Sequence, residues 1–452
     1  MSLELAGGVV GVMRASGERE RKVDVRRRGI ALSKAGDEAG AESAFREADA
    51  GGDAFSAWRV GLLLAGRGDV GGAEEAYRRA DERGSANGAE SLGVMLYRRG
   101  DVDEAEAAFR RGDERGSAGA AHNVGLLLGE RGDPDGAIAA LRRADERGSA
   151  SGARDLGLLL RKRGDADGAL AAFVRADERG NLDAVVNVAR ELERRGDLAG
   201  AEAAFRRADE RGSANGALGL GFLLERRGDR ESAIAAFVRA DHGGSDSAPW
   251  VLGRRALDRG DLDGAEAAFR RSDERGSAAG ADYLGALLVE RGKLAEGERA
   301  LRRADDRGSA EGASNVAVLL EHRGDAAGAE AAYRRADERG SANGVYGLFA
   351  ILYERGDLDD ALIALRRADE RGHAEAAYNM GEYFQQQGDQ AAAEEAFRRA
   401  EERGSAHGAS ALAVQLTARR DWNGARAALK RASQAERASQ HPLSRLVKRL
   451  TR

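Results

Sequence analysis

Small and apolar residues recur along this chain with the period of an α-helix, in short stretches that glycine interrupts. In the stretch 86–117, residues at i, i+3, i+4 and i+7 mark one helix face, namely Ala89, Leu92, Gly93 and Leu96. A second such face follows at Ala105, Ala108, Phe109 and Gly112. The pattern predicts two amphipathic helices, which we call helix A and helix B.

The residues between the two stripes predict where each helix stops. Gly100 can adopt the left-handed conformation that closes helix A, and Asp101 is a good N-cap for helix B, with Glu104 placed to complete a capping box. Gly116 and Ser117 have the same roles between helix B and the next helix A. We therefore expect an antiparallel helix pair with tight turns.

This helix pair recurs with a step of 32 residues. Gly-Asp stands in the A-to-B turns from Gly36 to Gly388, replaced by Gly-Lys at 292 and followed by Arg-Asp at 420, and thirteen such units fill residues 22–437. Pro134 and Pro249 fall in first turns of helices, where proline is tolerated. The predicted organisation is an N-terminal extension or cap at 1–21, the thirteen repeats as one solenoid, and a C-terminal segment at 438–452.

The units resemble tetratricopeptide repeats, and their junctions resemble those of Sel1-like repeats. Leu92-Gly93, Ala105, Phe109 and the alanines 80 and 144 stand at tetratricopeptide spacing, and residues 371–381 read like a Sel1-type junction. The unit is shorter than a standard tetratricopeptide unit and lacks the longer A-to-B loop of Sel1 repeats. The resemblance implies an all-α fold, a right-handed superhelical solenoid of antiparallel helix pairs, with helix A lining the concave side.

Positions 2, 5, 6, 9, 12 and 13 of helix A vary from unit to unit, and they share the helix face opposite the buried stripe. In tetratricopeptide proteins that face looks into the groove, and aromatic and arginine side chains are the usual anchors of protein interfaces. The predicted partner-binding residues are Arg26, Trp58, Arg59, Tyr97, His122, Arg154, Arg161, Trp250, Tyr283, Tyr346, Tyr353 and Tyr378. The alternative, above all for Phe55 and Phe222, is that aromatics only fill space between successive A helices.

Charge is distributed differently on the two helices. Helix B repeats Arg-Arg-Ala-Asp-Glu-Arg-Gly, as at 78–84, and we expect most of these charges to be solvated convex surface with i, i+4 pairs such as Glu74 with Arg78. The variable positions of helix A carry an excess of basic residues in units one to five and of acidic residues in units nine to twelve. The sequence thus predicts a groove that is electrically polar from end to end, which would orient a partner.

The C-terminal segment is basic and amphipathic. Apolar residues at Leu443, Leu446 and Val447 alternate with Arg445 and Lys448 after Pro442. We expect a capping helix over the last repeat, and docking on a membrane surface or on a partner is the alternative.

Residues for catalysis or metal binding do not form a recognisable pattern. The chain has no cysteine, its six histidines are dispersed over different units, and no phosphate-binding loop or nucleophile elbow occurs. The carboxylates recur in every unit, as structural residues would. We expect no enzyme activity, no cofactor and no metal site.

Composition and charge bear only indirectly on the kind of partner and on the compartment. A net charge of −5, from 72 basic and 77 acidic residues, gives no global attraction to nucleic acid or to an anionic membrane. Residues 3–13 are too short and lack the basic lead-in of a signal peptide or a membrane span. We expect a soluble cytoplasmic protein, a compartment that suits the absence of cysteine.

The leading functional hypothesis is a protein-protein interaction scaffold or adaptor that holds a protein or peptide partner in the groove lined by A helices. Two alternatives stay open. One is an architectural protein that self-associates end to end or through its tail. The other is a helical-repeat binder of single-stranded RNA, which the acidic second half disfavours.

Overall fold

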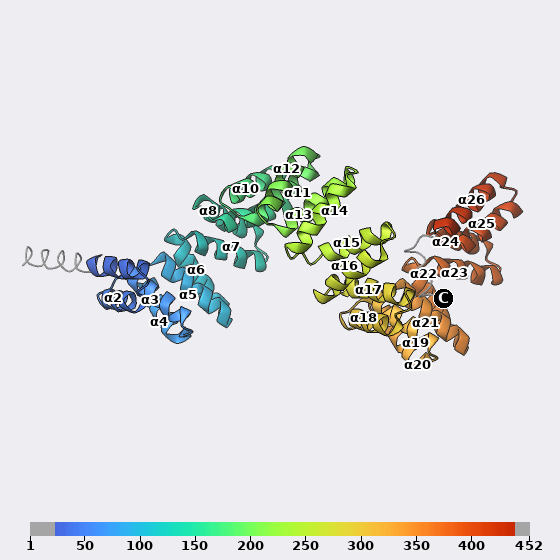
Figure 1. Ribbon diagram of the computed structural model, residues 1–452, viewed down its shortest axis with the longest axis horizontal. Coiled ribbons are helices and arrows are strands. Elements are labelled where there is room, and N and C mark those ends of the chain that lie inside the picture. The colour runs from blue at the N-terminus through green and yellow to red at the C-terminus, as the bar shows by residue number, and fades with distance from the viewer. Residues whose placement is uncertain (1–22, 439–452) are drawn as a thin grey trace, which may run out of the picture. The chain divides into compact units, whose positions relative to one another are not determined.

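The computed structural model describes residues 23–438, and in that range every regular element is an α-helix (Figure 1). The chain divides into two compact units, Met1–Gly219 and Leu220–Arg452, and the division falls inside α13 (Ala214–Arg226). The predicted all-α solenoid of antiparallel helix pairs is confirmed. The proposed N-terminal extension and almost all of the proposed C-terminal helix lie outside the described residues.

Helices of the first unit follow one another as B and A helices after a first helix at 23–34. They are α2 (Glu38–Ala50), α3 (Ala54–Gly66), α4 (Val70–Glu82), α5 (Ala86–Arg99), α6 (Val102–Glu114), α7 (Ala118–Glu130), α8 (Pro134–Glu146), α9 (Ala150–Lys162), α10 (Ala166–Glu178), α11 (Leu182–Arg194) and α12 (Leu198–Glu210). Odd-numbered helices are A helices and even-numbered ones are B helices.

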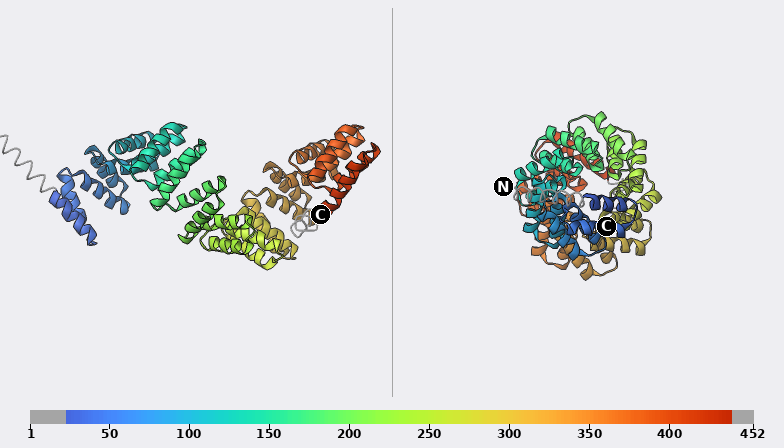
Figure 2. Two further views of the ribbon diagram at one scale, coloured as in Figure 1. Left: turned by 90° about the horizontal axis from the view of Figure 1, so that it is seen from above. Right: turned by 90° about the vertical axis from the view of Figure 1, so that its left-hand side faces the viewer.

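The second unit has the same alternation, and its helices run from green to red in Figure 2. Its helices are α14 (Arg230–His242), α15 (Ala248–Asp258), α16 (Leu262–Glu274), α17 (Ala278–Glu290), α18 (Leu294–Asp306), α19 (Ala310–His322), α20 (Ala326–Glu338), α21 (Ala342–Arg355), α22 (Leu358–Glu370), α23 (Ala374–Gln386), α24 (Gln390–Glu402), α25 (Ala406–Ala418) and α26 (Trp422–Ala438). α15 starts late, after the Gly-Gly-Ser-Asp-Ser stretch at 243–247, and Pro249 stands in its first turn.

The turns form as the glycine ladders predict, with one correction. Gly100 has a φ of 97° and caps α5, and Ser117 Oγ accepts the Ala120 N–H at 3.0 Å at the start of α7. The predicted capping box at Asp101 is wrong, because its side chain makes no cap hydrogen bond and pairs with Arg99. At most other A-to-B turns the aspartate does cap, usually onto a glycine three residues later, and Asp357, with Asp360 at that place, is a second exception. Glu104 occupies that place in α6, and its like charge and its bulk disfavour the close approach of Asp101.

The core of each repeat is a small residue set against a large one. Phe109 of α6 is 3% exposed and lies over Gly93 of α5, where a Cβ atom would come within 2.6 Å of the ring. Leu92 and Leu96 of α5 pack with Phe109 in the same apolar cluster. The helices of a pair therefore approach closely along the predicted stripes. The opposite face of helix A points away from its helix B.

Successive repeats are joined by buried ion pairs that the sequence interpretation missed. Asp145 of α8 is 3% exposed, and Arg175 Nη2 and Arg179 Nη1 of the next repeat donate to it at 2.5 Å each. The aspartates of the same motif at 49, 81, 113, 273, 305 and 369 each receive two arginines in the same way. We call this arrangement the aspartate clamp.

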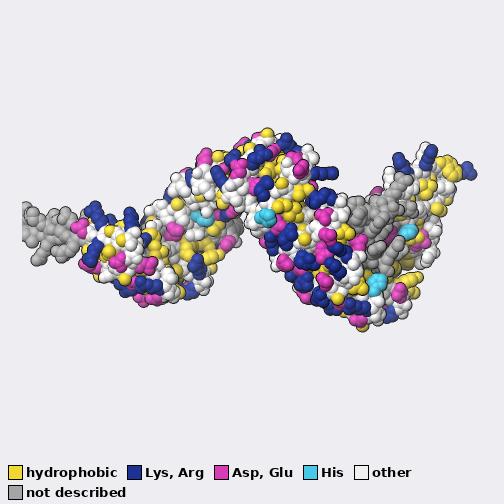
Figure 3. All heavy atoms as spheres, viewed as in Figure 1, with side chains coloured by type: hydrophobic (Ala, Val, Ile, Leu, Met, Phe, Trp, Pro, Cys, Tyr) yellow, Lys and Arg dark blue, Asp and Glu magenta, His cyan; other side chains and the backbone are white. Residues whose placement is uncertain are grey.

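The clamp corrects the expectation that most helix B charges are solvated surface. Burial tends to raise the pKa of Asp145, but the hydrogen bonds and charges of Arg175 and Arg179 outweigh it and hold that pKa below its ordinary value. The predicted i, i+4 pairs are confirmed on the surface, as between Arg78 and Glu74 at 2.8 Å. Figure 3 shows the result, with cationic and anionic side chains interspersed over the visible face.

Candidate binding surface

The predicted partner-binding residues lie on A helices of both units. Two of them are largely exposed, Tyr97 of α5 at 43% and Tyr353 of α21 at 60%. The others are half-buried: Arg26, Trp58, Arg59, His122, Arg154, Arg161, Trp250, Tyr283, Tyr346 and Tyr378. The burial of most of them comes from contacts between successive A helices.

In the first unit, hydrogen bonds join neighbouring A helices along this face. Trp58 Nε1 donates to Ser91 Oγ at 3.1 Å, from α3 to α5. His122 Nε2 lies 2.7 Å from Asp155 Oδ2, from α7 to α9. Both contacts join position 5 of one helix A to position 6 of the next. These side chains thus hold the stack together as well as forming its surface.

The second unit repeats this register with different residues. Asn315 Nδ2 of α19 donates to Asp282 Oδ1 of α17 at 2.8 Å. Asn379 Nδ2 of α23 donates to the Tyr346 hydroxyl of α21 at 3.1 Å. Complementary residues 33 positions apart in the sequence indicate these pairs. Comparing one variable position with its equivalents in other units does not reveal them.

Aromatic rings and guanidinium groups cluster at the start of the first unit. The Phe55 and Trp58 rings lie 5.5 Å apart, and the Arg26 guanidinium lies 5.7 Å from the Phe55 centroid. The Arg59 guanidinium lies 5.2 Å from the Phe45 ring. These distances are those of cation–π contacts, so Arg26 and Arg59 already contact aromatic rings of this chain.

A similar cluster stands in the second unit. The rings of Trp250 (α15) and Tyr283 (α17) meet edge to face at 6.0 Å. The Arg254 guanidinium lies 5.4 Å and 5.3 Å from their centroids, and its Nη1 donates to the Tyr283 hydroxyl at 2.7 Å. This arginine was not among the predicted residues, although it occupies position 9 of the same face.

Further along the second unit, tyrosine rings lie against histidine rings. Tyr346 lies over His373 at 4.1 Å, and Tyr378 lies 5.6 Å from His407. Burial lowers the pKa of His373 to about 4, and its Nδ1 accepts the Ala376 N–H at the start of α23. His373 is therefore a neutral N-cap at physiological pH.

The remaining predicted residues have separate surroundings. Arg154 forms ion pairs with Asp155 and Asp183 at 2.8 and 3.3 Å. The Tyr97 hydroxyl lies 3.4 Å from a Glu130 carboxylate oxygen. Arg161, within the described part of the chain, has no ion-pair or hydrogen-bond partner. The set is therefore a row along the A helices and does not converge on one pocket.

Two carboxylates on A helices of the second unit, Asp282 and Glu375, have no arginine or lysine partner among the described residues. Asp282 is bonded by an amide, and burial together with the nearby Glu311 charge raises its pKa to about 6, against the lowering effect of the Asn315 hydrogen bond. Glu375 accepts from Ser405 Oγ at 2.9 Å and lies 3.0 Å from His407 Nδ1. This contrasts with the arginine partners of the aspartate clamp, and it leaves negative potential on the surface.

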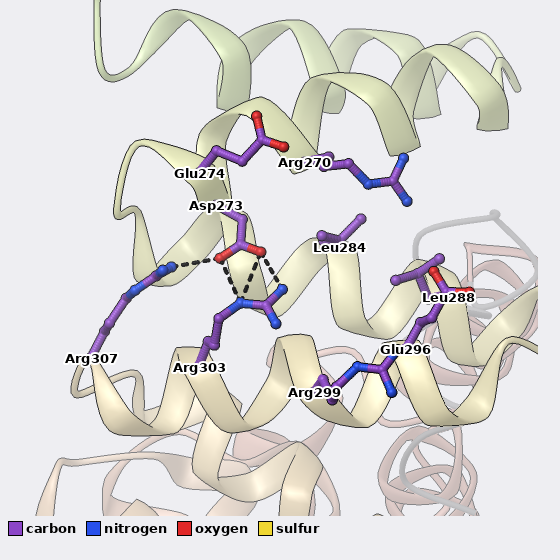
Figure 4. A pocket seen from close by; sticks show the side chains of 9 residues that line it. All are labelled: Arg270, Asp273, Glu274, Leu284, Leu288, Glu296, Arg299, Arg303 and Arg307. Atoms are coloured by element: carbon purple, nitrogen blue, oxygen red, sulfur yellow. Dashed lines mark hydrogen bonds and ion pairs between the residues drawn. The ribbon is translucent and has the colours of Figure 1, made fainter.

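The described residues also form a polar groove on the B-helix side of the second unit (Figure 4). It has a volume of about 450 Å³ between α16 and α18, over Leu284 and Leu288 of α17. Asp273 on its wall is already bound by Arg303 and Arg307, as the dashed lines in Figure 4 mark. The groove is therefore lined by an aspartate clamp, whose ion pairs join neighbouring repeats.

Within residues 23–438, no helix combines the length and the apolar character needed to cross a membrane. No cluster of three or more histidine, aspartate or glutamate side chains in that range could hold a metal ion.

Comparison with known proteins finds a family model that matches two stretches of the chain. The tetratricopeptide repeat model matches residues 61–120 and 346–407. A protective antigen of uropathogenic Escherichia coli with an SLR fold is similar at 21% identity, over 91% of this chain and 96% of its own, with a TM-score of 0.48. A Sel1 repeat protein from Oxalobacter formigenes is 22% identical over 58% of this chain and 86% of its own, with a TM-score of 0.46. No curated protein sequence matches the chain.

The two matched stretches lie in different units of the molecule, and the stretches between and beside them repeat the same residues at the same 32-residue step. Most of their helix pairs have bounds and glycine turns at the same places in the 32-residue unit as those of the matched repeats. Residues 61–120 and 346–407 are thus similar to tetratricopeptide repeats, and the described chain is an all-α repeat solenoid.

Proposed function

We propose that this chain is a non-catalytic scaffold that binds a protein or peptide partner on the surface formed by its A helices. Tetratricopeptide-type repeats are generally protein-interaction scaffolds. The observation that carries the proposal is the exposure of large aromatic side chains, Tyr97 and Tyr353, on A-helix faces whose residues differ from repeat to repeat. Exposed tyrosines beside arginines and carboxylates are typical anchors of a protein interface.

The packing of neighbouring repeats supports the A side as the inner surface. Successive A helices contact one another directly, as α3 with α5 and α5 with α7 in the first unit, and α17 with α19 and α19 with α21 in the second. A stack whose A helices approach so closely curves toward its A side within each unit. A curved surface of this kind surrounds an extended ligand better than a flat one does.

The test is affinity capture with the full chain from extracts of its native cell, followed by mass spectrometry and a binding measurement with the captured partner. Tyr353→Ala and Tyr97→Ala are the variants of choice, because both side chains are exposed and their loss leaves the core intact. We expect at least a tenfold loss of affinity for one of them, about 1.4 kcal/mol or more.

A matched control is Trp422→Ala. Trp422 is 64% exposed and begins α26, a B helix, so the variant removes an exposed ring of the opposite helix class. Affinity should be unchanged in this control. Equal losses in all three variants, or none in either tyrosine variant, would contradict the A-helix surface as the binding site.

A further inference from the structure

The A helices from α19 to α25 present a surface from which basic residues are excluded. At the six variable positions of these four helices there is no lysine or arginine, in a chain that has 72 of them, and there are five glutamates: Glu311, Glu321, Glu354, Glu375 and Glu382. We call these five side chains the glutamate surface. Glu311 has neutral partners, Ser341 and Asn343, and none of the five has a lysine or arginine partner within residues 23–438.

Two members of the glutamate surface have free side chains as far as residues 23–438 go. Glu354 at the end of α21 is exposed and Glu382 of α23 is half-buried, and neither carboxylate has a hydrogen bond or an ion pair in that range. By contrast Glu330 on the neighbouring B helix α20 binds both Arg334 and Arg355. The surface therefore has unused capacity for cationic groups.

Aromatic rings lie among these carboxylates. On α21 the rings of Tyr346, Phe349 and Tyr353 follow one another at 5.6 and 5.8 Å, and Tyr353 is 60% exposed. Rings of this kind accept lysine or arginine side chains on their faces and aliphatic side chains against their edges. The combination fits a short segment that alternates basic and aliphatic residues.

The chain itself contains such a segment. Residues 439–452 hold Arg445, Lys448, Arg449 and Arg452 and no acidic residue, together with four aliphatic side chains at Leu443, Leu446, Val447 and Leu450. We propose that this basic C-terminal segment binds the glutamate surface of its own chain, where a partner would have to displace it. Displacement by a partner rests on the proposed function, whereas binding of the segment to its own chain does not.

The segment is long enough to reach. Fourteen residues follow Ala438, the end of α26, and they span up to roughly 46–50 Å when extended. α26 packs on α25, and α25 contacts α23. Packed neighbouring helices lie about 8–10 Å apart, so α21, two A helices before α25, is within about 30 Å.

Amide hydrogen exchange of the full chain tests the proposal. We expect the amides of residues 443–452 to exchange at least tenfold more slowly than in a free peptide of the same sequence, and to lose that protection in about 0.5 M NaCl, where exposed ion pairs are screened. The double variant Glu354→Gln/Glu382→Gln should lose the protection as well. Neither glutamate has a partner within residues 23–438, so this variant removes charge without breaking a described contact.

The matched control is Glu338→Gln/Glu370→Gln, which removes two exposed charges from the B helices α20 and α22. It should keep full protection. Protection that survives in the Glu354/Glu382 variant would overturn the proposal in favour of a cap on α26, where Leu429 is 53% exposed. Unprotected amides in the unaltered chain, or equal losses in both variants, would overturn it too.

Carbodiimide crosslinking locates the contact, because the chain has few lysines and Lys448 is the one within the segment. In the monomer fraction we expect Lys448 joined to Glu354, Glu375 or Glu382. Crosslinks of Lys448 that appear only in dimers would show that the segment binds a second copy, and this outcome overturns binding within one chain.

Discussion

Two carboxylates, one on each side of the repeats, have opposite surroundings. On the B side Asp145 is almost fully buried and bound by two guanidinium groups of the next repeat. On the A side Asp282 is bound by the neutral amide of Asn315. The arginine-bound aspartate of the B side recurs along the chain, whereas the carboxylates of the A helices vary, and some of them, such as Asp155, are bound by an arginine as well. The B side therefore joins neighbouring repeats in a constant way, and the variable A side is the candidate surface for recognition.

The largest expected effect comes from removing a clamp aspartate. Asp145→Ala leaves Arg175 and Arg179 without their carboxylate at a junction that water reaches only in part. Breaking a buried pair costs about 3–5 kcal/mol, and the partial exposure of both arginines reduces this to about 2 kcal/mol. Because long repeat arrays need not unfold in one step, the measurement is local amide exchange in α8, α9 and α10, which should be faster.

Glu146→Ala is the neighbouring control on the same helix, because Glu146 is exposed and makes no ion pair in the described structure. It should change the free energy of local opening, measured by amide exchange, by less than about 0.5 kcal/mol.

The clamp also makes the stability of the stack depend on pH. The pKa of Asp145 is lowered by folding, so its contribution is complete above the ordinary value of 3.8 and declines as the pH falls below it. Equal effects of the two variants at pH 7 would show that the clamp does not hold the stack.

An opposite pH dependence is expected on the A side. Burial raises the pKa of Asp282 from 3.8 to about 6, so between these values the folded chain keeps a proton that the unfolded chain releases. Its contribution is therefore highest below about pH 4 and falls as the pH rises through 6. Asp282→Asn should stabilise the chain by about 2 kcal/mol more at pH 7.5 than at pH 4.5, since one pKa unit is worth about 1.4 kcal/mol and part of the effect is already present at pH 4.5.

Local amide exchange in α17 and α19 at the two pH values measures this effect. Glu290→Gln on the same helix α17 is the control, because it removes a charge that has no hydrogen-bond partner in the described range. A stabilisation by Asp282→Asn that is the same at pH 4.5 and 7.5 would mean that loss of charge at this site is not its cause.

The glycine turns and the helical period of the apolar residues were enough to predict the fold. Glycine turns such as Gly100 and the stripe of Leu92, Gly93 and Leu96 depend on residues close in sequence, and the structure has them where expected. Contacts between repeats were harder to see. The burial of Asp145 depends on Arg175 and Arg179, about 30 residues away, and a repeated charged motif looks the same in sequence whether it is solvated or paired.

The candidate surface was predicted only as a row of positions. Variation at position 5 was interpreted as freedom from packing, yet Trp58 and Tyr346 are each bonded to the next A helix. Variation in sequence is compatible with packing when the partner position varies in step. Exposure of individual side chains, which separates Tyr353 from Tyr346, depends on the neighbouring repeat and could not be predicted from one helix alone.

The smallest expected effect compares two adjacent arginines. Arg78 lies on the surface and pairs with Glu74 one turn earlier, whereas Arg79 reaches Asp49 of the preceding repeat at 2.8 Å. Arg78→Ala should cost about 0.3 kcal/mol, the usual worth of an exposed i, i+4 pair, and less in high salt. Arg79→Ala should cost about 1 kcal/mol, because Arg83 still holds the buried Asp49 carboxylate. Amide exchange in α2, α3 and α4 measures both, and the order of the two costs decides whether burial of the carboxylate, rather than the presence of an arginine, is what ties one repeat to the next.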